Sequence, residues 1–296
     1  MIRPARFGFN AETAENNFFQ SQPNEPETIH EKALTEFDEM VKKIRSEGVQ
    51  VLVVDDSSDL ATPDSVFPNN WFSTHADGTL VLYPLYAPNR RLERKPTVLS
   101  AIMERYTVSH QVDLSTYENS DRFLEGTGSM VLDRQHRIAY AAVSPRTHPD
   151  LLKIFCEKLQ YTPIAFEAVD SKGRPLYHTN VVMTVADRYV VICLDSIPDR
   201  QERDSVIQTI ERSGKTIITI DPEQLNQFAG NLLQVENNKG ENFLIGSARA
   251  FGSLRNDQRD LLASFNTLLE VSIPTIESVG GGSARCMLAE IFLPWK

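Results

Sequence analysis

Pairs of short apolar segments, joined by tight polar turns, recur along this chain of 296 residues. Their spacing of roughly 50 to 60 residues is typical of repeat and propeller proteins. Each pair has the strand length and turn chemistry of a β-hairpin. The predicted hairpins span 71–84, 130–143, 181–194 and 232–246. The recurrence favours a propeller-like α/β repeat, with a plain α/β sandwich as the alternative.

Helices and single extended segments alternate with these hairpins. The clearest predicted helix covers 33–44, whose apolar residues fall on one face and which Gly48 follows as an expected C-terminal cap. Further helices are predicted over 98–106, 151–159, 201–212 and 257–269, and extended segments over 51–54, 108–114, 164–169 and 216–220. No sequence motif copies itself between units, so the prediction depends on the order of the elements. We expect one domain over residues 1–296.

The overall charge narrows the range of partners. A net charge of −10 argues against nucleic acid and against an anionic membrane surface, because both select clustered Lys and Arg. Small charged metabolites remain compatible with it. The N-terminus lacks the apolar run of a signal peptide, and no stretch approaches the length of a membrane span, so we expect a cytoplasmic protein.

The cysteines predict neither a disulfide framework nor a thiolate metal site, because Cys156, Cys193 and Cys286 are odd in number and widely spaced. Cys156 and Cys193 lie in apolar segments and are expected in the core. We expect no metal and no organic cofactor.

The best candidate for a nucleophile is Cys286, which follows the glycine run 280–282. Consecutive glycines remove the steric bar to positive φ and let the backbone approach a ligand closely. A thiol needs only a neighbouring base or positive charge to become a reactive thiolate. The alternative is a structural turn before a buried cysteine, since free cysteine is often buried.

Polar residues stand at the start of the predicted hairpins, where the catalytic groups of a propeller-like ring are expected to gather. Together with the C-terminal cysteine they are Asn69, Asn70, Glu125, His178, Asn180, Asn231 and Cys286. A nucleophile, an imidazole, a carboxylate and several amides form a coherent set for a thiol enzyme. The alternatives are a capping or buried structural histidine at His178 and a solvated loop carboxylate at Glu125.

In their order and spacing, these motifs resemble the guanidino-group-modifying superfamily, which includes arginine deiminases, dimethylarginine dimethylaminohydrolases, agmatine deiminases and amidinotransferases. The motifs are Phe67-Pro68-Asn69-Asn70, Leu124-Glu125-Gly126, His178-Thr179-Asn180 and the glycine-rich approach to Cys286. Met1–Pro4, Phe7–Asn10 and Phe67–Trp71 most resemble the citrulline-utilisation hydrolases, or citrulline ureidases. The resemblance implies a five-bladed α/β propeller (pentein) of pseudo-fivefold ββαβ repeats.

The resemblance also implies roles for the site residues. Cys286 would attack the planar carbon of a ureido or guanidino group and form a covalent thio-adduct that water splits. His178 would protonate the leaving amine and then activate water, and Glu125 would orient the substrate nitrogens and the imidazole. Phe67 and Asn69 would belong to the substrate site.

Two departures from the arginine deiminase pattern bear on the substrate. Asn70 and Asn180 stand where those enzymes place aspartates, and amides suit a neutral ureido group better than a cationic guanidinium. We therefore expect hydrolysis of citrulline to ornithine, ammonia and carbon dioxide. Arg90 and Arg146 resemble the binding arginines of the superfamily and would hold the α-carboxylate of an amino-acid substrate, with a surface arginine as the alternative for either.

Two other functions stay open. An arginine or methylarginine hydrolase of the same superfamily would release citrulline and ammonia or an amine. A non-catalytic binding protein is also compatible, because a ribosome anti-association factor uses the same propeller without catalysis. The polar stretch 10–28 is predicted as a loop, long enough to be a lid or a wrapping arm.

Overall fold

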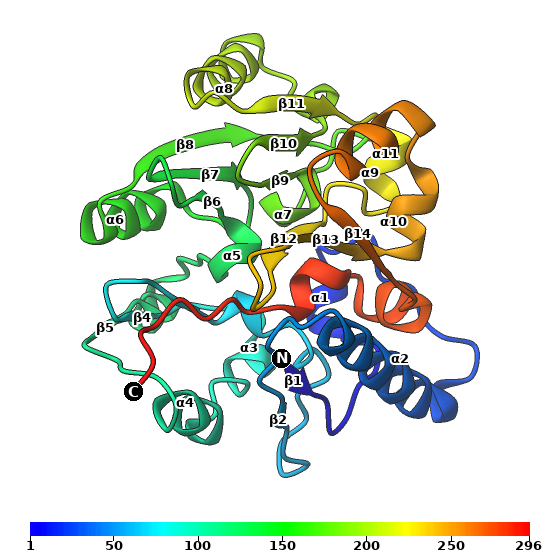
Figure 1. Ribbon diagram of the computed structural model, residues 1–296. Helices are drawn as coiled ribbons and strands as arrows, with labels where there is room; N and C mark the ends of the chain where they lie inside the picture. Colours follow the sequence, from blue (N-terminus) through cyan, green and yellow to red (C-terminus); the bar gives the residue numbers. More distant parts are fainter.

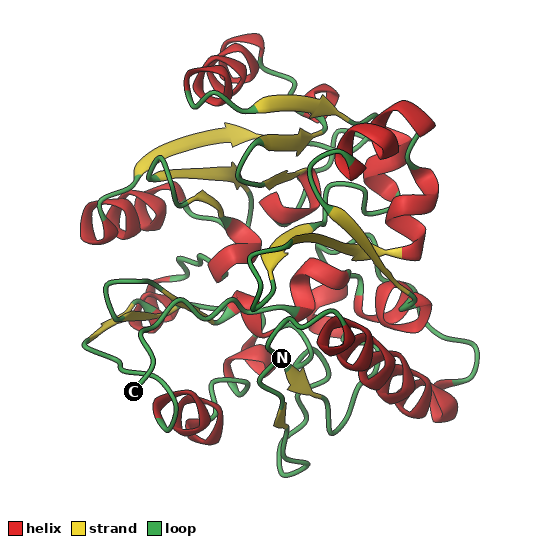
Figure 2. Ribbon diagram, in the orientation of Figure 1, coloured by secondary structure: helices red, strands yellow, loops and turns green.

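The computed structural model describes residues 1–296 as an α/β structure built from small sheets. Four of the sheets have three strands, and one has two. The sheets surround a common centre, and the longer helices lie outside them (Figures 1 and 2). The predicted hairpins are confirmed, one in each three-stranded sheet.

Each three-stranded sheet pairs an antiparallel hairpin with a third strand that runs parallel to the second. A helical connection precedes the third strand, because parallel neighbours cannot be joined by a tight turn. The strands are β3 (Phe72–Thr74), β4 (Thr79–Leu82), β5 (His110–Asp113), β6 (Val131–Asp133), β7 (Ile138–Val143), β8 (Thr162–Glu167), β9 (Met183–Val185), β10 (Tyr189–Ile192), β11 (Thr216–Thr219), β12 (Leu233–Glu236), β13 (Asn242–Ser247) and β14 (Thr267–Val271). The two-stranded sheet pairs β1 (Ile2–Arg3) with β2 (Val54–Asp55) in parallel.

The helices are α1 (Ala11–Ala14), α2 (Pro26–Ser46), α3 (Pro88–Arg91), α4 (Pro96–Met103), α5 (Gly126–Ser129), α6 (Pro149–Leu159), α7 (Thr179–Val182), α8 (Arg200–Arg212), α9 (Pro222–Asn226), α10 (Ala248–Ser253) and α11 (Asn256–Ala263). The longer helices bury apolar side chains, as α2, α4, α6 and α8 do. Gly48 follows α2 with a φ of +79°, the left-handed conformation that ends many helices. This confirms the cap predicted for α2.

The prediction of one helix over 257–269 is wrong. α11 ends at Ala263, and β14 begins at Thr267 and pairs in parallel with β13. Leu269 and Val271 are buried whereas Leu268 and Glu270 are only partly buried, which is the period of a strand with one face in the core. Pairing with β13 and burial of Leu269 and Val271 therefore outweigh the helical propensity of the leucines.

Two shorter predictions also need correction. Only Val54 of the extended segment 51–54 lies in a strand. The stretch 10–28 is not all loop, because it contains α1 and the start of α2. We call residues 10–25 the N-terminal arm.

Short helical turns occupy the centre of the molecule. α5 packs against α7 and against the 3₁₀ turn Pro68–Asn70, which packs against a second 3₁₀ turn, Ala284–Met287 (Figure 1). Three of these turns directly precede a hairpin, those at β3, β6 and β9. The fold therefore brings together the polar residues that the sequence places at the start of the hairpins.

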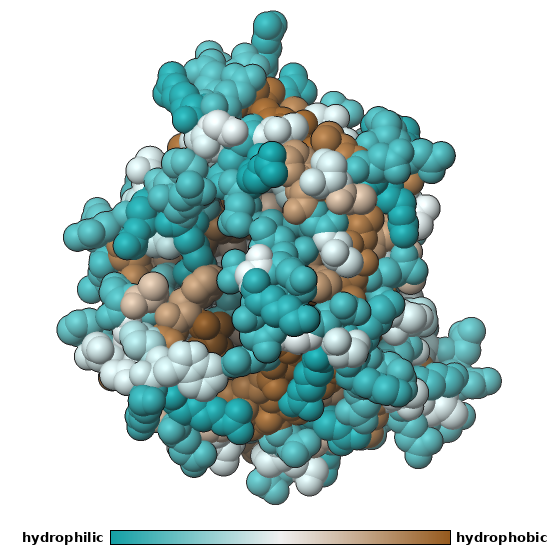
Figure 3. All heavy atoms as spheres, viewed as in Figure 1, coloured by the Kyte–Doolittle hydropathy of each residue, from teal (hydrophilic) through white to brown (hydrophobic).

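Hydrophilic residues cover most of the face seen in Figure 3, and apolar residues are visible mainly in recesses between them. None of the helices combines the length and the apolar character that crossing a membrane would require.

Candidate active site

Cys286 lies in the second 3₁₀ turn, directly after the glycine run, and its side chain is buried. Gly281 has a φ of +65°, and a side chain there would come within 2.6 Å of Asn17 in the N-terminal arm. A side chain at Gly280 would come within 2.9 Å of the Phe67 ring. The glycines therefore allow the arm and an aromatic ring to close over the thiol.

Two amide groups contact the thiol. Asn180 Nδ2 lies 3.5 Å from Cys286 Sγ, and Asn231 Nδ2 lies 3.3 Å from it. Asn231 also donates to the backbone oxygen of Asn180 at 2.8 Å and accepts from the backbone N–H of Arg285 at 3.1 Å. The sulfur is therefore surrounded by neutral hydrogen-bond donors.

His178 and Glu125 form a buried pair, with 2.7 Å between Nε2 and Oε2. The backbone N–H of Tyr86 donates to the other carboxylate oxygen at 2.9 Å. Arg146 Nη1 and Arg90 Nη1 lie 3.5 Å and 3.9 Å from Oε2. Burial alone would raise the pKa of Glu125, but Arg146, the hydrogen bond from His178 and Arg90 outweigh it and hold the pKa well below its ordinary value.

The protonation state of His178 follows from this pairing. Burial lowers the pKa of His178 to about 4, although the hydrogen bond to Glu125 opposes the shift. The imidazole is therefore neutral near pH 7 and donates its Nε2–H to the carboxylate, which leaves Nδ1 as a base with no protein hydrogen bond. A side chain at Gly128 would come within 2.8 Å of Nδ1, so the glycine keeps this face of the ring open.

Arg90 is held by protein partners. Its Nε and Nη2 each lie 2.9 Å from the Glu93 carboxylate, a bidentate pair in which both side chains are buried. Its Nη1 donates to Asn70 Oδ1 at 2.7 Å. The side chain lines the cavity next to Cys286, but the fork predicted to take a substrate carboxylate is occupied by Glu93.

Phe67 and Asn69 take different positions, although both were predicted in the substrate site. The Phe67 ring lines the cavity, but Asn69 does not. Asn69 is fully buried, accepts from Asn70 Nδ2 at 3.2 Å and donates to Thr127 Oγ1 at 3.4 Å. Asn69 therefore supports Asn70 from behind, while Arg90 fixes the amide oxygen of Asn70.

Arg146 connects the centre of the molecule to the N-terminal arm. Its Nε donates to Asn16 Oδ1 at 2.7 Å, and its Nη2 donates to the backbone oxygen of Thr13 at 2.8 Å. Its guanidinium also lies 5.0 Å from the centre of the Tyr177 ring. Because these contacts use two of its five N–H groups, further donors remain on Nη1 and Nη2.

The N-terminal arm closes the site. Asn17 Nδ2 donates to the backbone oxygen of Gly281 at 3.1 Å, and Tyr177 Oη donates to the same oxygen at 2.6 Å. The cavity left beside Cys286 measures about 10 Å³, roughly the space for a single water molecule. The cavity is therefore too small for an amino acid.

Three buried polar atoms around this cavity have no hydrogen-bond partner: Asn16 Nδ2, Asp64 Oδ1 and Asn180 Oδ1. Asp64 lines the cavity, and its other oxygen accepts from Asn10 and Thr13 of the arm. Burial raises the pKa of Asp64, although Arg90 opposes the shift. Unpaired buried groups are rare and costly, so they indicate where a polar ligand would bind.

Sequence reasoning missed Asp64, Asn16 and Asn17. None of them starts a hairpin or stands beside a glycine run, so no local pattern distinguishes them. Asn16 and Asn17 reach the site because the arm folds back over the centre. Asp64 lies in the loop before the 3₁₀ turn Pro68–Asn70 and meets the arm there, with Asn10 bonded to Asp64 at 2.8 Å. Only the three-dimensional structure could identify them.

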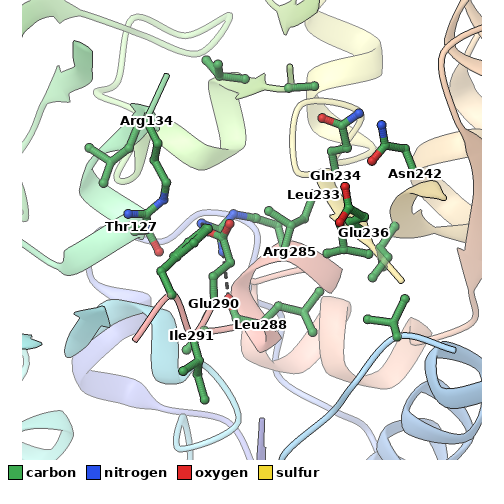
Figure 4. Close-up of a pocket in the computed structure, with 18 of the residues that line it drawn as sticks. Thr127, Arg134, Leu233, Gln234, Glu236, Asn242, Arg285, Leu288, Glu290 and Ile291 are labelled. Atoms are coloured by element: carbon green, nitrogen blue, oxygen red, sulfur yellow. Dashed lines mark hydrogen bonds and ion pairs between the residues drawn. The ribbon is translucent and has the colours of Figure 1, made fainter. Parts of the chain in front are cut away.

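A much larger cavity, with a volume of about 780 Å³, lies elsewhere. It is bounded by β6, β9, β12 and the C-terminal segment 288–295, and the Arg285 side chain projects into it (Figure 4). Arg285 donates there to Leu288 O at 2.8 Å and pairs with Glu290 at 3.2 Å. Cys286 does not line this cavity, so the candidate active site is separate from it.

Comparison with known families agrees with the geometry. The family model described as N,N dimethylarginine dimethylhydrolase, eukaryotic, matches residues 3–293. The chain belongs to this family, within the guanidino-group-modifying superfamily of pentein proteins. A search of curated proteins finds no significant match.

Solved structures share the fold at low sequence identity. The N-terminal domain of ArgZ, a cyanobacterial arginine dihydrolase crystallised with substrate, is 18% identical with a TM-score of 0.73, over 99% of this chain and 98% of that one. Against full-length ArgZ, the match covers 98% of this chain but 40% of that one. AgrE with L-arginine is 17% identical with a TM-score of 0.72, over 97% and 39% of the two chains. A dimethylarginine dimethylaminohydrolase adduct with S-methyl-L-thiocitrulline is 12% identical with a TM-score of 0.62, over 97% and 96%.

Proposed function

We propose that this protein is a cysteine-dependent hydrolase of citrulline that produces ornithine, ammonia and carbon dioxide. The observation that carries the choice of substrate is that the side chains in contact with the thiol are amides. Asn70 and Asn180 present amides there, and Glu125 is already neutralised by His178 and two arginines. The one cavity carboxylate with an unpaired oxygen, Asp64, suits the α-ammonium group of the substrate. A cationic guanidinium would then lack a carboxylate of its own, whereas a neutral ureido group needs none.

The unpaired atoms support an amino-acid substrate. Asp64 Oδ1 is an acceptor suited to an α-ammonium group, and Asn16 Nδ2 is a donor suited to an α-carboxylate. Arg146 bonds to Asn16 and retains further donors, so the carboxylate would lie between these two side chains. Asn180 Oδ1, next to the thiol, would accept from a ureido N–H. Arg90 would act by holding Asn70 and Glu125, not by binding the carboxylate.

The chemistry uses the thiol of Cys286 and the neutral imidazole of His178. Cys286 Sγ attacks the ureido carbon as its proton passes to His178 Nδ1, and Glu125 stabilises the imidazolium that forms. His178 then gives this proton to the departing amine, which leaves a carbonyl group bonded to sulfur. Water, deprotonated by His178, attacks that carbonyl and the S–C bond breaks. Together, the two steps consume one water and release ornithine and carbamic acid, which decomposes to ammonia and carbon dioxide.

We further propose that the five sheets are the blades of one α/β propeller and that residues 1–296 form a single catalytic domain. The four ββαβ units of one topology support this, together with the smaller β1–β2 pair. The site residues would then lie on the central axis, where the turns that precede the blades meet.

An arginine hydrolase is the second candidate, and the structural neighbours favour it. ArgZ is an arginine dihydrolase, and AgrE binds L-arginine. Asn180 Oδ1 would accept from a guanidinium N–H as well as from a ureido N–H. The same thiol and imidazole would serve either substrate.

A direct assay separates these candidates. The purified protein is incubated separately with citrulline, arginine and N,N-dimethylarginine, and ornithine, citrulline and ammonia are measured. We expect ornithine and ammonia from citrulline, and neither product with Cys286→Ser. Citrulline formed from arginine, without ornithine from citrulline, would contradict the proposal in favour of an arginine hydrolase. If none of the three substrates gives any product, the result would favour a non-catalytic protein.

A further inference from the structure

We propose that Asn231 is a positioning residue that orients the sulfur of Cys286 and favours its thiolate form. We call the two amide groups that contact the sulfur, Asn231 Nδ2 and Asn180 Nδ2, the neutral cradle. This inference rests on the proposed role of Cys286 as nucleophile. It concerns how a buried sulfur becomes reactive without a hydrogen bond from a cationic side chain. Asn231 is fully buried and stands directly before β12.

Hydrogen bonds fix the orientation of the Asn231 amide. Its Oδ1 must accept from the backbone N–H of Arg285, because that group is a donor only. Its Nδ2 must therefore face the two remaining partners, the Asn180 backbone oxygen at 2.8 Å and Cys286 Sγ at 3.3 Å. Both hydrogens of Nδ2 are engaged, and one of them points at the sulfur.

No positively charged side chain pairs with the sulfur. The Arg285 guanidinium is turned toward Leu288 and Glu290 in the large cavity (Figure 4). His178 is bonded through Nε2 to Glu125. Burial without a partner disfavours a thiolate, so N–H donors aimed at the sulfur must supply the stabilisation, and such bonds strengthen when the acceptor is charged.

Asn231 and Asn180 both donate to the sulfur, but they differ in whether they could also bind substrate. Asn180 has an unpaired Oδ1 beside the thiol and is therefore available to substrate. Asn231 has no unpaired atom, and neither asparagine side chain lines the closed active-site cavity. Its effect on the reaction would therefore pass through the sulfur and not through a direct contact with substrate, which predicts a change in kcat with KM nearly unchanged.

The test is the alkylation of Cys286 by iodoacetamide, which needs no substrate. Asn231→Asp keeps the acceptor for Arg285 but replaces the donor at the sulfur with a negative charge, and Asn231→Ser removes the donor without adding charge. We expect alkylation near pH 7 to slow about tenfold or more in Asn231→Asp and less in Asn231→Ser, with the rate recovering at higher pH. We also expect kcat to fall while KM changes less than about twofold.

The controls separate this role from a structural one. Cys286→Ser gives the background from Cys156 and Cys193, and Asn266→Ala removes a buried amide that bonds to Tyr189 Oη, far from Cys286 in the chain. Alkylation at wild-type rate in either folded Asn231 variant would overturn the proposal. If neither variant folds, Asn180→Ala must slow alkylation through the same cradle, and a wild-type rate there would overturn it. If no substrate is turned over but alkylation slows, the cradle stands and the proposed function fails.

Discussion

Asn180 places a neutral amide where a carboxylate would suit a guanidinium substrate. Introducing a negative charge at this position is therefore the sharpest test of substrate choice. Asn180→Asp puts a negative charge about where Nδ2 now lies, 3.5 Å from Cys286 Sγ. We expect kcat/KM for citrulline to fall at least about tenfold, and the ratio of arginine to citrulline turnover to rise, because the charge is unpaired against a neutral ureido group. Both values come from steady-state kinetics. Asn237→Asp, in the turn after β12, is the matched control, and an unchanged ratio in Asn180→Asp would contradict the expectation.

His178 makes the stability of the protein sensitive to acid. Its pKa is about 4 when folded against an ordinary value of 6.5, so the unfolded chain binds the proton more readily between these values. The stability that comes from the neutral imidazole is therefore present above pH 6.5 and is lost as the pH falls toward 4. The depressed pKa of Glu125 acts in the same direction at still lower pH. Both groups predict acid destabilisation.

We therefore expect the Tm to fall on going from about pH 7 to pH 5, and to fall less in His178→Gln, which has no proton to gain. Thermal unfolding followed by circular dichroism measures both. His110→Gln alters an exposed histidine in β5 and should behave like the wild type. An equal fall in His178→Gln and wild type would show that His178 is not responsible.

At the scale of the element, the short helix α5 directly follows Glu125 and packs near the His178 ring, and its two glycines have separate functions. Gly126 has a φ of +49°, and a side chain there would come within 2.3 Å of the Asn69 backbone oxygen. A side chain at Gly128 would instead meet Asn70 at 2.4 Å and the His178 ring at 2.7 Å. One glycine is required by the backbone, and the other by the side chains of the site.

Alanine substitutions should separate these functions. We expect Gly126→Ala to lower the Tm strongly, and Gly128→Ala to reduce activity about 100-fold or more with a smaller loss of Tm, because it displaces the imidazole. Gly252→Ala in α10 meets nothing within 4 Å and should keep full activity with an equal or higher Tm. Full activity in Gly128→Ala would argue against His178 as the catalytic base.

The elements also show what the sequence could predict. Turn residues and strand alternation are local signals, so every hairpin was found, and the candidate residues before β3, β6 and β9 were found with them. β14 was missed because its leucines suit a helix equally well, and only its pairing with β13 makes this segment a strand. Asn16 was missed because the folding of the N-terminal arm brings it to the site, and Asp64 was missed because only its contact with the arm, not a local pattern, marks it.

At the scale of the whole molecule, the last residues close the chain against its first three-stranded sheet. Thr74 Oγ1 in β3 donates to Glu290 O at 3.0 Å and accepts from the backbone N–H of Phe292 at 2.8 Å. Thr107 N donates to Pro294 O at 2.8 Å, and the Trp295 ring packs on Tyr106. Segments far apart in sequence thus depend on each other, as expected of one cooperative unit.

We expect a single thermal transition, with near-ultraviolet circular dichroism and activity lost together. Thr74→Val keeps the shape of the side chain but removes both hydrogen bonds, and it should destabilise the protein by about 1 to 3 kcal/mol without splitting the transition. Two separate transitions, in the wild type or in this variant, would contradict a single domain over residues 1–296.

The closed N-terminal arm has a consequence for inhibition. Since the cavity beside Cys286 is about 10 Å³, only molecules of the protein with a displaced arm can admit a ligand. The apparent affinity is then the intrinsic affinity scaled by the open fraction, and association cannot be faster than opening. Amino-acid analogues that react with the thiol should therefore show slow onset and, once the arm has closed over them, long residence.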